Sequence, residues 1–231
     1  MQLQILSGGA AQGLVDALKP QFKAQTGCEI EGTFGAVGAM KDKLLSGAPA
    51  DMLILTSALI ADLVRSGHAV AGSAADIGTV PTAVAVRAGD PAPPIGDATA
   101  LHDALRAADG VYFPDPKLAT AGIHFAKVIE ALGLTEELKN RLRTFPNGAT
   151  AMRELAAAKS AQPIGCTQVT EILNTPGTTL VGLLPKEFEL ATIYTCGVCA
   201  KAREPALARQ FAALLTGAAA QQLRESLGFS R

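Results

Sequence analysis

The sequence contains no tryptophan, and aromatic side chains make up only 4% of its 231 residues. Proteins that bind single-stranded nucleic acid stack bases on aromatic rings, so this scarcity argues against such a surface. The 20 basic and 21 acidic residues are interspersed, without the run of Lys and Arg that marks a nucleic-acid patch. The composition predicts no nucleic-acid partner and leaves small polar ligands open.

Long apolar runs are also missing. No stretch has the roughly 18 apolar residues that a membrane helix needs, so we expect no membrane insertion. Met1 and Gln2 lead directly into strand-like residues, without the basic and apolar regions of a secretory signal. Two locations remain open: periplasmic, if a signal peptide has been removed, and otherwise cytoplasmic.

Cysteine is sparse, with four residues in the chain. Cys196 and Cys199 form a lone C-x-x-C within "ATIYTCGVCA", which alternates like a buried strand. Side chains three apart on a strand point to opposite faces, and no second ligand pair for zinc is present. We therefore predict core cysteines, no metal and no cofactor, while the redox state stays open.

Alternating strands and helices dominate what is present. Residues 2–6 read as a strand, and residues 10–25 as a helix whose Leu14, Leu18 and Phe22 share one face. The continuous apolar run "ADMLILT" is typical of a buried parallel strand. This order predicts an α/β protein, with one large domain or two lobes.

In the rest of the chain, the pattern predicts a strand that runs from residue 80 into a proline-rich loop, followed by further strands and helices. We expect one helix over residues 135–145, in "TEELKNRLRTF", and a last long strand in "ATIYTCGVCA". The tail after Pro205 reads as two amphipathic helices.

Four predicted helices begin beside glycine together with Ser, Thr or Asn, in "LSGGAAQ", "TFGAVGAM", "DPKLATAGIHF" and "FPNGATAM". A helix start presents unpaired N–H groups and partial positive charge to an anion. For any single junction, a tight turn that needs glycine is the alternative interpretation. Neither a P-loop nor a G-x-G-x-x-G fingerprint is present, so the recurrence favours a small anion over a nucleotide.

These segments resemble the type II periplasmic solute-binding proteins, in particular the molybdate-binding group and its carboxylate-handling relatives. The resemblance rests on the first three junctions together with "SGAPADM", "IGCTQVTEI" and "LRESLGF", and it covers nearly the whole chain. It implies two α/β lobes with a ligand cleft between them. Residues 1–80 plus 196–231 form one lobe, residues 81–195 form the other, and hinge strands lie near 80–87 and 191–198.

The resemblance also implies what the protein does. Such proteins capture a solute and deliver it to an ABC importer, and we expect a monomer. The ligand-binding residues expected on this basis are Ser7, Gly8, Gly9, Ala36, Val37, Gly38, Thr56, Thr120, Ala121, Gly122, Asn147, Thr167 and Gln168. Residues 36–38 lack the hydroxyl that molybdate-binding members offer, and Cys166-Thr167-Gln168 stands where their Tyr is expected. We therefore favour a small organic carboxylate over a molybdate-type oxyanion.

A second interpretation follows from relatives that resemble aconitate isomerase, which shifts a proton on an unsaturated tricarboxylic acid without a cofactor. An acid or base must then lie near the substrate carbon. The candidates are His124 and Cys166. Each has a structural alternative, because a helix histidine can be partly buried and a small cysteine can fill a core.

Overall fold

The computed structural model describes residues 1–230, which divide into two compact units. The first unit combines Met1–Val80 with Thr192–Arg231, and the second consists of Pro81–Ala191. The chain crosses from one unit to the other within the long strand β4 (Ala75–Arg87) and beside the start of β9 (Ala191–Val198).

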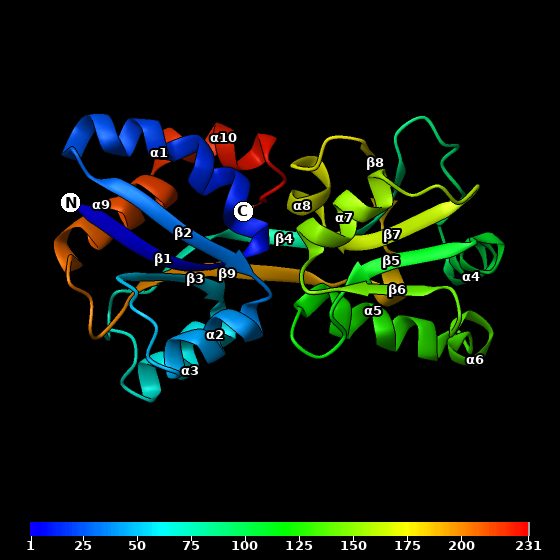
Figure 1. Ribbon diagram of the computed structural model, residues 1–231, viewed down its shortest axis with the longest axis horizontal. Coiled ribbons are helices and arrows are strands. Elements are labelled where there is room, and N and C mark those ends of the chain that lie inside the picture. Colours follow the sequence, from blue (N-terminus) through cyan, green and yellow to red (C-terminus); the bar gives the residue numbers. More distant parts are fainter. Residues whose placement is uncertain (231) are drawn as a thin grey trace. The chain divides into compact units, whose positions relative to one another are not determined.

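The first unit begins with three strand-helix pairs and ends with the C-terminal helices (Figure 1). Its further elements are β1 (Gln2–Gly8), η1 (Gly9–Ala11), α1 (Gln12–Thr26), β2 (Glu29–Gly35), α2 (Val37–Leu45), β3 (Met52–Thr56), α3 (Ser57–Arg65), α9 (Pro205–Thr216), η3 (Ala218–Ala220) and α10 (Gln221–Ser226).

Its sheet has the strand order β2-β1-β3-β9. β1 pairs in parallel with both β2 and β3, whereas β9 runs antiparallel to β3. The register places Gly8 opposite Gly35. The predicted α/β alternation is confirmed in this unit, and the carboxyl ends of β1, β2 and β3 meet at one edge of the sheet.

The core of the first unit follows the predicted patterns. Leu14, Leu18 and Phe22 of α1 are all buried, because their spacing puts them on one helix face. The ring of Phe22 packs edge-on against Phe211 of α9, with the ring centroids 5.0 Å apart. The apolar run of β3 is fully buried, as expected for a strand covered on both faces.

Asp51, in the "SGAPADM" phrase, is a buried scaffold residue. Its Oδ2 accepts a hydrogen bond from the backbone N–H of Gln4 at 2.8 Å. Its Oδ1 accepts from the backbone N–H groups of Arg203 and Glu204, at 2.7 and 3.0 Å, just before α9 begins. One carboxylate therefore connects β1 to the residues that precede α9, which are 152 and 153 positions after Asp51 in the sequence.

Asp51→Ala should lower the free energy of unfolding by about 3 kcal/mol, because three partly buried backbone N–H groups lose their acceptor at once. Chemical denaturation measures the change. Asp42→Ala, at an exposed position of α2, is the matched control and should stay within about 0.5 kcal/mol of the parent. An equal loss in both variants would contradict the scaffold role.

The second unit contains the remaining elements. They are α4 (Ala98–Ala107), β5 (Gly110–Pro114), α5 (Thr120–Ala131), α6 (Thr135–Leu138), β6 (Leu142–Phe145), α7 (Gly148–Ala156), β7 (Pro163–Gln168), α8 (Val169–Leu173), β8 (Thr178–Leu183) and η2 (Lys186–Phe188).

In this unit β5 pairs in parallel with β6 and β7, while β4 runs antiparallel to β7 and β8. The carboxyl ends of β5, β6 and β7 therefore share one edge, where α5, α7 and α8 begin. Phe113 and Phe125 meet edge to face at 5.5 Å in the core behind that edge.

The helix predicted over residues 135–145 is wrong. α6 ends at Leu138, and residues 142–145 form the edge strand β6. The Leu and Arg residues of this segment favour a helix, but pairing with β5 and stacking of Phe145 on Tyr112, 6.0 Å apart, outweigh that preference. Strand β8, which was not predicted, pairs with the outer edge of β4.

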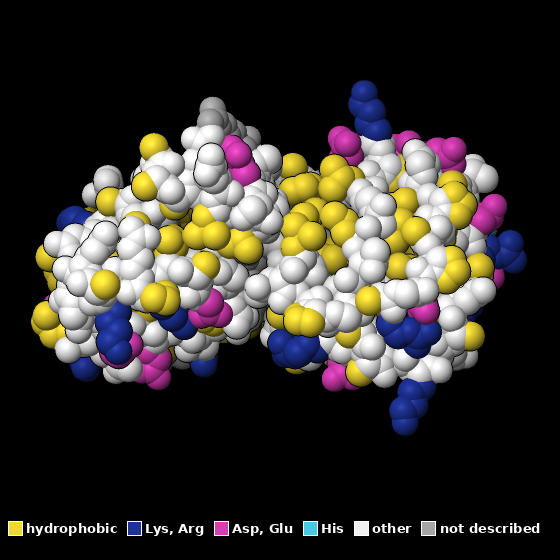
Figure 2. Space-filling view, turned by 90° about the horizontal axis from the view of Figure 1, so that it is seen from above, with side chains coloured by type: hydrophobic (Ala, Val, Ile, Leu, Met, Phe, Trp, Pro, Cys, Tyr) yellow, Lys and Arg dark blue, Asp and Glu magenta, His cyan; other side chains and the backbone are white. Residues whose placement is uncertain are grey.

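All four cysteines are buried and free, which confirms the prediction of core cysteines. Burial raises the pKa of Cys196 and of Cys199 to about 12, so both stay protonated thiols near neutral pH. Among residues 1–230 there is no helix with the length and apolar character to cross a membrane. On the face drawn in Figure 2, basic and acidic side chains are interspersed.

Candidate functional site

The first unit presents adjacent helix starts at one edge of its sheet. η1 begins at Gly9 directly after β1, and α2 begins at Val37 one residue after β2. Because Gly8 and Gly35 are register partners, the two starts are neighbours. Neither start has a side-chain cap, so the backbone N–H groups of Val37 and Gly38 are suited to receive an anion.

Gly8 is required at this edge by space and not by its backbone angles. Its φ of −58° is open to any residue. A Cβ at Gly8 would lie 2.7 Å from Cγ1 of Val37 and 3.1 Å from Cε1 of Tyr194. The glycine therefore lets the first turn of α2 and the buried ring of Tyr194 close onto the end of β1.

Two predicted ligand residues in this unit are engaged with the backbone. Ser7 is fully buried, and its hydroxyl donates to the carbonyl oxygen of Gly8 at 2.9 Å. Thr56 caps α3 by accepting from the N–H of Leu59 at 3.4 Å. The hydroxyl hydrogen of Ser7 is directed at the chain itself in this arrangement.

The second unit has a comparable edge at the end of β5. α5 begins at Thr120 without a side-chain cap, so the N–H groups of Thr120, Ala121 and Gly122 stand at a helix start. A Cβ at Gly122 would collide with the carbonyl oxygens of Pro114 and Asp115. Glycine thus packs this helix start directly against the strand end.

The start of α7 is different, because the chain supplies its own carboxyl group there. Asn147 caps the helix by accepting from the N–H of Thr150 at 2.8 Å. The buried carboxyl of Glu171 accepts hydrogen bonds from the backbone N–H groups of Gly148 and Ala149. It also accepts from the backbone N–H of Gln168 and from the hydroxyl of Thr167, the latter at 2.5 Å.

Burial raises the pKa of Glu171, and these hydrogen bonds oppose the shift without cancelling it. The predicted ligand residues Asn147 and Thr167 are therefore both committed to internal partners in the structure. A side chain on Gly148 would collide with the Glu171 carboxyl and the Thr167 hydroxyl, so this cradle is already full.

Gln168, at the end of β7, has the opposite character. Its side chain is 2% exposed, yet neither its Nε2 nor its Oε1 has a hydrogen-bond partner. Thr82, its register partner on β4, and Thr170, two residues further on, also carry buried hydroxyls without partners. Each buried polar group left unpaired costs about 1–3 kcal/mol, so these three side chains are suited to pair with a polar ligand.

The two candidate catalytic residues have ordinary structural environments. Cys166 is fully buried within the apolar core of the second unit, where burial raises the pKa of its thiol well above the ordinary value. A thiol held protonated in this way is a poor nucleophile or base. Nε2 of His124 lies 2.7 Å from the carbonyl oxygen of Phe188, which fixes that nitrogen as the donor and leaves Nδ1 as the basic nitrogen.

Sequence reasoning missed Thr82, Thr170 and Glu171. Thr82 lies among apolar residues in "VPTAVAV", and Thr170 and Glu171 are adjacent polar residues between Val169 and Ile172. These polar residues beside apolar ones are the available signal, because a polar residue in a buried segment needs a partner.

The fold and these donor-rich sheet edges define a solute-binding protein. The family model for bacterial extracellular solute-binding proteins matches residues 3–230, and the chain belongs to this family. The type II α/β fold expected from the sequence is confirmed.

Named relatives differ in activity. An aconitate isomerase from a Pseudomonas species is 26% identical over 98% of this chain and 86% of the relative. The molybdate-binding protein of Mycobacterium bovis is 23% identical over 98% of this chain and 84% of the relative. The periplasmic molybdate-binding protein of Azotobacter vinelandii matches with a TM-score of 0.82 at 20% identity, covering 99% of both chains.

Proposed function

We propose that the protein captures a small organic carboxylate, one per chain, and delivers it to an ABC-type importer, acting outside the cytoplasm. The family supports solute binding in general. The choice of a carboxylate depends mainly on one observation, the buried and unpartnered amide of Gln168.

An amide brings one donor group and one acceptor to a ligand. A fully ionised tetrahedral oxyanion offers only acceptors, so it would satisfy Nε2 of Gln168 and leave Oε1 facing negative charge. A carboxylate that also carries a hydroxyl satisfies both atoms, with the hydroxyl donating to Oε1. The unpaired hydroxyls of Thr82 and Thr170 add neutral donors beside the amide.

The remaining donors are backbone groups. The uncapped starts of η1 and α2 in the first unit, and of α5 in the second, offer N–H groups and partial positive charge. We assign anion contacts in the first unit to Gly9, Val37 and Gly38, and in the second unit, which also holds Gln168, to Ala121 and Gly122. Ser7, Thr56, Asn147 and Thr167 act behind them by fixing the backbone.

Thermal shift and calorimetric titration with matched acids test this assignment. Citrate and tricarballylate differ by one hydroxyl, as do malate and succinate. We expect the hydroxylated acid of a pair to bind at least about tenfold more tightly, because the unhydroxylated acid leaves Oε1 of Gln168 unpaired. Binding of molybdate or sulfate with no response to any of the four acids would overturn the choice of a carboxylate.

An isomerase is the second candidate, because the aconitate isomerase relative spans nearly the whole chain and His124 keeps a basic Nδ1. Ultraviolet absorbance of trans-aconitate reports isomerisation directly. If the protein is an isomerase, His124→Gln should abolish turnover and still bind the acid, since glutamine retains a donor toward Phe188. Tight binding with no absorbance change would remove this candidate.

A further inference from the structure

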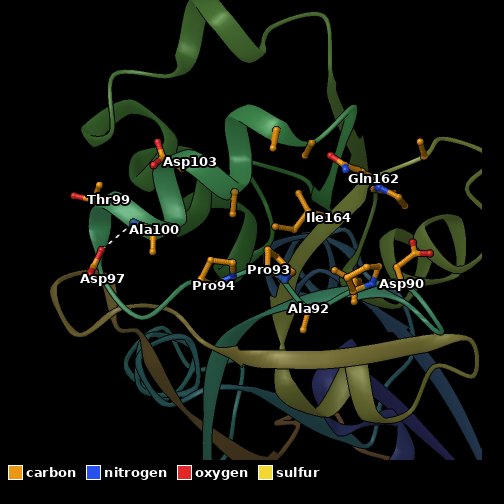
Figure 3. Close-up of a pocket in the computed structure, with 17 residues that line it drawn as sticks. Asp90, Ala92, Pro93, Pro94, Asp97, Thr99, Ala100, Asp103, Gln162 and Ile164 are labelled. Carbon is orange, nitrogen blue, oxygen red and sulfur yellow. Dashed lines mark hydrogen bonds between the residues drawn. The ribbon is translucent and has the colours of Figure 1, made fainter.

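The second unit contains a large open pocket at the side of its sheet, with a volume of about 730 Å³. One wall is α4, another is the proline-rich loop of residues 90–97, and the floor includes the first residues of β7 (Figure 3). This volume suits a drug-sized organic molecule.

Apolar and small side chains make up most of the lining. The lining includes Pro93 and Pro94 of the loop, Ala100 and Ala104 of α4, and Val86 and Ile164, which are register partners on the paired strands β4 and β7. Because alanines occur where larger core residues would fill the space, the helix leaves a hollow that an apolar group can enter. Burial of apolar surface then favours binding.

The charged groups of the pocket are all acidic. Asp90, Asp97 and Asp103 line it, and no Lys or Arg of the described chain is among the lining residues. Oδ1 of Asp90 pairs with Arg87 at 2.9 Å, whereas its Oδ2 is buried without a hydrogen-bond partner. Asp97 caps α4 through Ala100, and Asp103 lies beside His102. The pocket therefore favours a cation and disfavours an anion.

This pocket is distinct from the proposed anion site. Pro163 and Ile164, which line it, begin β7, whereas Gln168 ends the same strand. The two regions lie at opposite ends of one strand and have opposite charge preferences.

We propose that this pocket is a second binding site, for a small amphipathic organic cation whose apolar body lies between α4 and the proline-rich loop. The cationic head group lies beside Asp97 and Asp103 at the α4 side of the pocket, whereas Asp90 lies at the opposite side (Figure 3). The chemistry required is an aromatic or aliphatic group on a primary or quaternary ammonium.

Three probes share a phenylalkyl group and differ in the charge of the head group: 4-phenylbutylamine, 4-phenylbutanol and 4-phenylbutyrate. Comparing their affinities separates the contribution of charge from that of apolar burial. Methyl NMR spectra of the full chain follow Ala100, Ala104 and Ile164 during titration. We expect the ammonium probe to shift these methyls and to bind at least about tenfold more tightly than the carboxylate probe, with the alcohol between them.

Two variants locate the site. Ala100→Leu fills the hollow with a good helix former and should abolish the shifts. Asp103→Asn removes one exposed carboxylate and should weaken the ammonium probe about threefold, whereas Asp42→Asn on α2 of the other unit should not. Equal affinity for all three probes, no methyl shifts, or undiminished binding by Ala100→Leu would each overturn the proposal.

Discussion

Glu171→Ala should lower the free energy of unfolding by about 3–5 kcal/mol, which is the largest stability effect that we expect from one substitution in this chain. The substitution removes the acceptor for three backbone N–H groups and the Thr167 hydroxyl, all within a buried site. It also leaves a cavity beside Gly148 that the packing cannot close. Equilibrium unfolding in urea measures the loss.

Glu154→Ala is the matched control, because Glu154 is exposed on α7 itself. Formate supplies a second check, since it fits the space of the missing carboxyl and should restore part of the stability of Glu171→Ala but not of the control. A loss no larger than that of the control would show that the carboxyl does not hold the start of α7.

The same residue gives the stability a pH dependence of known sign. The folded-state pKa of Glu171 is raised above the unfolded value of about 4.3, so the folded protein holds this proton more tightly. The stabilising contribution of Glu171 is therefore greatest in acid and falls as pH rises from about 4.3 through the folded pKa. The difference in stability between the parent and Glu171→Ala should shrink over that range.

Gln168→Leu should have opposite effects on folding and on binding. Leucine has a similar volume and no polar atoms, so the variant no longer buries an unpaired amide and should gain about 1–3 kcal/mol of stability without ligand. Binding of a hydroxylated carboxylate should fall by at least about a hundredfold, because the ligand loses both partners and meets an apolar surface. Denaturation and calorimetric titration of the same preparation give the two values.

Gln210→Leu, at an exposed position of α9, is the control and should change neither quantity. A stabilised Gln168→Leu variant that still binds with the affinity of the parent would show that the amide serves neither folding nor the ligand. A destabilised variant would show that Gln168 has a structural role.

The periodic features of the chain were predictable, because they depend on local pattern. The helix face of Leu14, Leu18 and Phe22 and the buried β3 follow from hydrophobic spacing alone. The strand β6 was not predictable from local pattern. Its Leu and Arg residues prefer a helix. The strand forms because it pairs with β5, which is distant in the sequence and becomes its neighbour only when the chain folds.

In the candidate site too, some features follow from local sequence and others depend on contacts formed only in the folded chain. Gly8 and Gly122 were predicted as ligand-binding residues, and the packing reason for glycine at both positions, where a Cβ would collide with a neighbouring element, appears only in the structure. The partners of polar groups were not predictable. Thr167 lies near the carboxyl end of β7, where ligand residues are expected, but whether its hydroxyl faces a solute or Glu171 depends on how α7 and α8 pack together. The same holds for Asp51, which occurs in the most family-specific phrase and serves the scaffold.

The most direct test is a titration of the ¹⁵N-labelled full chain with citrate, followed by NMR at the side-chain amide of Gln168 and the backbone amides of Ala121 and Gly122 in the same unit. We predict that the three signals shift together, with one midpoint and one citrate per chain. Saturation with citrate that leaves the Gln168 amide unmoved would contradict the account.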